Sequence, residues 1–167
     1  MIAIEITSQK IFMNQLLNGD TFDIFLLEEA TVKTAATYTI DGYVNREFYD
    51  PEELESGIAS YEFMPWADAK ALCFQLIKGK RTPLLLKLVL QLKPQQMQAL
   101  LDSKSDTTFD LRQLKSLVLT IKYDGTRTIL TTATSYHSFV MNKEPDQLWD
   151  KAMVQYLTKK EIPFQEL

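Results

Sequence analysis

The side chains with the clearest potential to bind a partner are five bases in one short stretch. The sixteen residues from 78 to 93 contain no acid, so their local charge is +5. Such a stretch forms either a solvated basic face or a contact surface, because clustered cations attract anionic molecules. Our hypothesis is that this stretch forms a contact surface for a protein or another acidic partner. The candidate binding residues are Lys78, Lys80, Arg81 and Lys87.

The Gly-Lys pair at positions 79 and 80 superficially resembles a phosphate-binding loop. That loop needs an earlier glycine, five residues before the pair, and it needs the N-terminus of a helix to follow. Position 74 is phenylalanine, and Gly79 comes at the predicted end of a helix, where the dipole is negative. Lys78 and Lys80 complement such an end, and Gly79 suits a left-handed cap. We therefore expect no nucleotide and no other cofactor.

Acidic residues gather in a second stretch, which could supply oxygen ligands for a metal ion. From Asp41 to Glu62 there are seven acids and one base, a local charge of −6. Carboxylates are the ligands that hard cations prefer, although no spacing here matches a calcium loop. Several of these acids also suit helix capping, as Asp50 does before Pro51. Glu29 and Asp41 are the candidate ligands if the protein binds a metal ion. A carboxylate-based enzyme, with or without a metal ion, is therefore an alternative function.

The single cysteine is expected to be structural, and the single histidine to be structural or solvent-facing. His137 is the only base available to a catalytic triad, but no nucleophile-elbow motif accompanies it. Cys73 has no partner for an internal disulfide and lies in an apolar helical pattern, which predicts a buried thiol.

Length and charge narrow the class of protein. The 167 residues, 46% of them hydrophobic, fit one domain with a substantial core. A net charge of −4 and a pI near 5.1 argue against general nucleic-acid binding. The first residues lack the basic start of a signal peptide, and no apolar run is long enough to span a membrane, so we expect a cytoplasmic protein. Partner identity and oligomeric state remain open.

Periodicity predicts a single α+β domain with a largely antiparallel sheet of about six strands. The order strand, helix, strand, strand occurs twice, over about 1–45 and about 84–140. An acidic helical insertion lies between them over about 46–80, and a C-terminal helix spans about 145–160. Trp66 and Trp149 fall on apolar helical stripes and are expected in the core; Leu72 falls on the first of these stripes.

A β-hairpin from Leu114 to Phe139 is the strongest local signal. Asp124-Gly125 between two alternating runs predicts a type I′ turn with these two residues at its centre. That turn would place Ile121 opposite Thr128 and keep the apolar side chains of the first strand on one face.

Four stretches carry a resemblance to a known family. They are Phe22 to Ala30, Thr39 to Gly42, Cys73 to Pro83 and the hairpin with its Thr132 to Ser135 tail. Through them the chain resembles an uncharacterised family of small cytoplasmic proteins from Firmicutes, a domain of unknown function. The resemblance covers most of the chain, implies a soluble, bacterial, single-domain protein, and transfers no site.

The doubled order of elements is also similar to that of a DNA sliding-clamp domain, which implies clamp-like association with nucleic acid as a further alternative. With no catalytic motif in the sequence, the function we expect first is a non-catalytic binding or assembly module.

Overall fold

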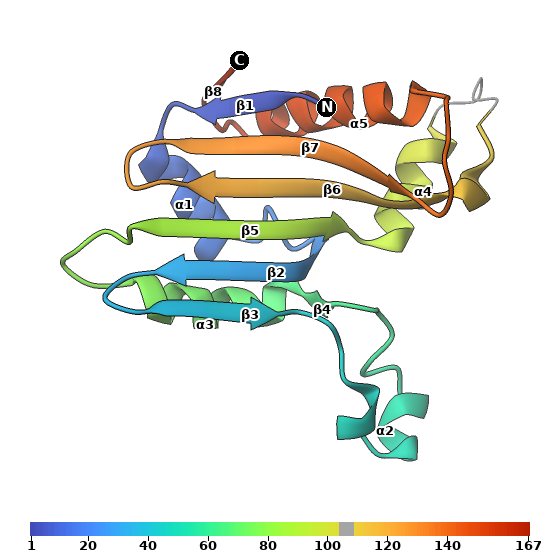
Figure 1. Ribbon diagram of the computed structural model, residues 1–167, viewed down its shortest axis with the longest axis horizontal. Coiled ribbons are helices and arrows are strands. Elements are labelled where there is room, and N and C mark those ends of the chain that lie inside the picture. Colours follow the sequence, from blue (N-terminus) through green and yellow to red (C-terminus); the bar gives the residue numbers. More distant parts are fainter. Residues whose placement is uncertain (104–108) are drawn as a thin grey trace.

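Alternating apolar residues build one large antiparallel sheet, and helices cover one of its faces (Figure 1). The computed structural model describes residues 1–103 and 109–167. The strand order is β3-β2-β5-β6-β7-β1-β8, with β4 paired to β2, which makes eight strands within these residues. The strands are β1 (Ala3–Ile6), β2 (Phe25–Lys33), β3 (Thr37–Asp41), β4 (Met64–Pro65), β5 (Leu85–Leu92), β6 (Leu114–Tyr123), β7 (Thr128–Tyr136) and β8 (Phe164–Glu166).

The longer helices lie behind the sheet in Figure 1, and the opposite face is open. They are α1 (Gln9–Leu17), α3 (Trp66–Ile77), α4 (Pro94–Asp102) and α5 (Glu144–Lys159). The described part of the chain also contains three short helices: η1 (Arg46–Phe48), α2 (Pro51–Glu55) and η2 (Leu111–Gln113). The fold is therefore the α+β class with an antiparallel sheet that the sequence predicts.

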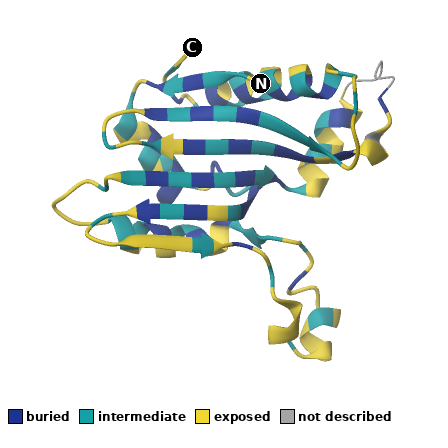
Figure 2. Ribbon diagram, in the orientation of Figure 1, coloured by how far each residue is buried: buried dark blue, intermediate teal, exposed yellow. Residues whose placement is uncertain are grey.

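Strand β5, which lies inside the sheet between β2 and β6, shows how the pattern sets the two faces. Leu86, Leu88 and Leu90 are fully buried under the helices, while the residues between them are partly exposed on the open face (Figure 2). Successive strand side chains point to opposite faces, so alternation along the chain becomes a covered side and an open side.

Both tryptophans lie in the core, as predicted. The indole Nε1 of Trp66 donates to the carbonyl of Leu16 at 3.0 Å, and that of Trp149 donates to the carbonyl of Val118 at 2.9 Å. Each large ring is thus buried without leaving its N–H unpaired, which would otherwise oppose burial.

The hairpin forms, but its predicted turn is wrong by one residue. Ile121 lies opposite Leu130, not Thr128, and Asp124 N donates to the carbonyl of Arg127. The turn is therefore centred on Gly125-Thr126, with positive φ (98°) at the glycine only, as in a type II′ turn. The register moves by two residues, so each side chain keeps its predicted face.

Two further details differ from the prediction. The sheet has eight strands instead of about six, because β4 and β8 are pairings of two and three residues with too few positions to show alternation. Leu72 is 52% exposed, because it lies on the part of α3 that its neighbours β2, α1 and β4 leave uncovered.

The two predicted units share an order but not a pairing. Strand β1 pairs with β7 and β8, whereas β5, its counterpart in the second unit, pairs with β2 and β6. The repeat along the chain is therefore not a repeat of the sheet.

Between β3 and β4 the chain leaves the sheet and forms a projection, which we call the arm (residues 43–63; Figure 1). A bridge between Tyr43 and Phe63 closes its base. In the described ranges, no helix combines the length and apolar character needed to cross a bilayer.

Candidate functional site

Three of the four candidate binding residues lie in the α3–β5 connection, and the fourth lies elsewhere. Lys78, Lys80 and Arg81 are exposed at the end of the molecule where β5 begins. Lys87 is on the open face of the sheet, directly opposite Lys122 on β6. Because strand side chains alternate in direction, the structure separates Lys87 from the other three.

The chain leaves helix α3 in an unexpected conformation. Lys78 is extended (φ −63°, ψ 147°), and Gly79 has φ 139°. Neither value is that of the left-handed cap near φ +57°, so the predicted cap at Gly79 is wrong. The extended Lys78 carries the connection away from the helix axis.

An apolar cavity of about 230 Å³ opens beside this connection. Thr82 from the connection contributes to its wall. Its other lining residues come from α1, α3, the connection, β5 and β6, and they include Lys10, Met13, Ile77, Pro83, Leu86 and Tyr123. The sequence does not predict this site, because its walls come from positions more than a hundred residues apart. Only the neighbouring basic stretch can be identified from the sequence.

One cation lines this cavity, and three more lie in the adjoining α3–β5 connection. Lys10 lines it, Lys78 follows the lining residue Ile77, and Arg81 precedes the lining residue Thr82. In the described part of the chain, none of these cations forms an ion pair. We call the cavity together with Lys10, Lys78, Lys80 and Arg81 the basic pocket. Free cations beside an apolar hollow suit a ligand with both anionic and apolar parts.

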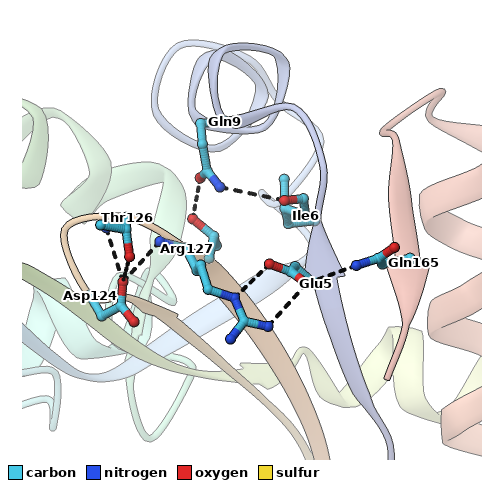
Figure 3. A network of polar contacts seen from close by, with 8 residues as sticks. Glu5, Ile6, Gln9, Asp124, Thr126, Arg127 and Gln165 are labelled. Atoms are coloured by element: carbon cyan, nitrogen blue, oxygen red, sulfur yellow. Dashed lines mark hydrogen bonds and ion pairs between the residues drawn. The ribbon is translucent and has the colours of Figure 1, made fainter.

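One wall of the basic pocket is held by the side chain of Gln9 at the start of α1. Gln9 donates to the carbonyl of Ile6 at 3.4 Å and accepts a hydrogen bond from the Thr128 hydroxyl (Figure 3). Ser8 caps the same helix by accepting from the N–H of Ile11. Since α1 is thereby fixed to the β6–β7 hairpin, the position of Lys10 follows from backbone and side-chain contacts.

The hairpin turn beside the pocket is also fixed. The Asp124 carboxylate accepts from the N–H groups of Thr126 (3.0 Å) and Arg127 (2.8 Å; Figure 3). These bonds, the one from Arg127 first, hold the pKa of Asp124 at about 2. The phenol of Tyr123, a lining residue, donates to the carbonyl of Gly125 at 2.8 Å.

An ion pair ties this turn to the first strand. Arg127 Nε and Nη2 donate to the two carboxylate oxygens of Glu5 at 2.6 and 3.0 Å, and Gln165 on β8 donates to Glu5 at 2.8 Å (Figure 3). The hydrogen bond from Arg127 is the main cause of the lowered pKa of Glu5. Arg127 is therefore neutralised within the protein, unlike the cations of the basic pocket.

The structure brings the two candidate metal ligands together. Glu29 and Asp41 lie directly opposite each other on β2 and β3, and both are exposed. One Asp41 oxygen already accepts from the N–H of Tyr43 at 3.0 Å. Among residues 1–103 and 109–167, no three His, Cys, Asp or Glu side chains gather closely enough to hold an ion.

The remaining reactive side chains are one buried thiol and one exposed imidazole. Cys73 is buried in α3, and burial raises the pKa of its thiol to about 11. His137 is exposed just after β7. The core position expected for Cys73 is therefore confirmed.

Comparison with known proteins gives a family. No curated protein matches the chain, and no solved structure does. One family model, described as a family of unknown function, matches residues 15–165. This match contains the α3–β5 connection, the arm and most of the sheet. The chain therefore belongs to the family of unknown function DUF5721.

Proposed function

We propose that this protein is a non-catalytic binding or assembly module of the bacterial cytoplasm, and that its contact surface is the basic pocket. The observation that supports the proposal is an apolar cavity of about 230 Å³ that Lys10 lines, next to a connection that carries three further cations; none of the four forms an ion pair in the described structure. The bacterial and cytoplasmic assignments rest on the family resemblance of the sequence.

The chemistry of the basic pocket indicates the class of partner. An apolar side chain that fills the cavity removes hydrocarbon surface from water, which stabilises a complex. Exposed cations around it attract carboxylates and steer the encounter, but their contribution falls as salt screens them. The expected ligand is an acidic peptide segment with one large apolar side chain.

Binding to labelled peptides would test this proposal. We would measure fluorescence anisotropy with an acidic peptide that contains one phenylalanine, with the same peptide carrying serine instead, and with single-stranded DNA, at roughly 50 and 200 mM salt. We expect the phenylalanine peptide to bind best, and binding to weaken at the higher salt.

The variant K80A/R81A should lose most of this binding while remaining folded. The matched control is K115A/K151A, which removes two exposed cations from β6 and α5. No binding of the acidic peptide by the wild type at the lower salt would refute the proposal. Preference for DNA, abolished by K80A/R81A, would favour the nucleic-acid alternative instead.

A metal-dependent carboxylate site is the second candidate function. The observation in its favour is the direct pairing of Glu29 with Asp41 across β2 and β3. A ligand that binds only the folded state raises the melting temperature by mass action. Melting in Mg²⁺, Ca²⁺, Mn²⁺ or a chelator, with E29Q/D41N as the control, would show a shift that the variant lacks if the site binds metal.

A further inference from the structure

The arm has little to hold it against the rest of the protein. Most of its residues are exposed, and Ala59 alone among them is buried (Figure 2). A capping box between Asp50 and Glu53 orders α2, and Phe48 packs edge-on against Tyr49 with ring centroids 5.3 Å apart. The arm is thus built by local contacts and offers its surface to solvent.

That surface combines negative charge with an exposed aromatic ring. The arm contains six acids and one base, a net charge of −5. Phe48 is 80% exposed and is flanked in sequence by Glu47. Exposed aromatic side chains are characteristic of contact surfaces, because they desolvate a large area at low entropic cost.

Phe48 and the basic pocket match in size and charge. An apolar cavity of about 150 Å³ accommodates benzene. The cavity here is about 230 Å³, large enough for a phenylalanine ring. The acids of the arm would meet the cations of the pocket. Phe139 is also exposed, at 90%, but no acid lies between Ser135 and Lys143.

One molecule cannot bring these two surfaces together. The basic pocket lies where β5 begins, whereas the base of the arm contacts the residues just after β5 ends: Tyr61 accepts from Gln95 at 2.6 Å, and Lys93 lies over its ring. Eight strand residues span roughly 25 Å. The arm also points away from the α3–β5 connection (Figure 1).

We propose that the arm of one copy inserts Phe48 into the basic pocket of a second copy. This inference rests on the proposed function and names its partner. Because the two surfaces differ, the contact is heterologous, and repetition gives a ring or an open chain of copies.

Charge reversal on each side provides the test. K80E/R81E breaks the pocket, and E47K/E52K breaks the arm without touching the capping box. By light scattering after gel filtration at low salt, the wild type should grow in mass with concentration. Each variant alone should remain monomeric, whereas an equimolar mixture should associate, because each variant retains one intact surface and the two reversed surfaces attract each other.

The variant F48S should weaken wild-type association about 30-fold, as loss of an aromatic hot spot does. F139S is the matched control and should associate like the wild type. F48S association equal to that of the wild type, or absence of association in the mixture of the two charge-reversed variants, would overturn the inference. A chain that stays monomeric but still binds the acidic phenylalanine peptide would overturn it as well, and would leave the proposed function standing.

Discussion

The sheet and the arm reach an ordered structure by opposite means. In the sheet, buried leucines and two tryptophans pack between strands and helices that are distant in sequence. In the arm, order comes from a capping box and from neighbouring aromatic rings, with almost no burial. The difference indicates that the sheet supplies stability and that the arm is maintained for its exposed surface, because burial and not local capping dominates folding free energy.

The largest expected change in unfolding free energy comes from replacing a glycine, and it differs between Gly42 and Gly57. A Cβ at Gly42, beside the sheet, would lie 1.7 Å from the carbonyl oxygen of Leu27. We expect G42A to cost about 4 kcal/mol or more, since the backbone must shift. At Gly57 in the arm nothing lies within 4 Å and φ is 86°, so G57A should cost only about 1–2 kcal/mol. Urea unfolding measures both; equal costs would contradict the comparison.

Truncation of apolar side chains gives the next largest effect. Leu119 is fully buried beneath the helices, and L119A should cost about 2–5 kcal/mol through lost burial and a cavity. Ile58 in the arm is 57% exposed, and I58A should stay within about 0.5 kcal/mol. Comparable losses of unfolding free energy in the two variants would show that the arm belongs to the cooperative core.

The sequence predicts the sheet better than the site for a physical reason. Alternation along β5 and β6 is a local property that directly determines which side chains are buried. The alternation does not determine the position of the hairpin turn. Asp124 accepts hydrogen bonds from the backbone N–H groups of Thr126 and Arg127, and the turn is centred on Gly125-Thr126.

The cavity could not be predicted from the sequence, because it depends on the tertiary structure. It forms only when α1, the α3–β5 connection and the hairpin meet, so no stretch of sequence contains it. The basic stretch could be identified from the sequence as a cluster of charges. The apolar lining residues, such as Met13 and Tyr123, could not be assigned to the same site from the sequence.

The smallest expected effect concerns the pH dependence of the sheet. The pKa of Asp124 is about 2 in the folded protein against an ordinary 3.8, so its contribution is complete above about pH 4 and is lost as the pH falls through 2. The melting temperature of D124N should therefore approach that of the wild type between pH 4 and 2. E55Q, in the arm, is the control. A gap between D124N and wild type that stays constant with pH would contradict this assignment.

Photo-crosslinking is the most direct test of whether the arm of one copy binds the basic pocket of another. Phe48 would be replaced by a benzophenone amino acid, and this chain would be mixed with an isotopically heavy chain and irradiated at low salt. We expect light-to-heavy crosslinks that map to the lining residues Met13, Ile77 or Tyr123. Crosslinks confined to one chain, or mapped to the open face of the sheet, would contradict it.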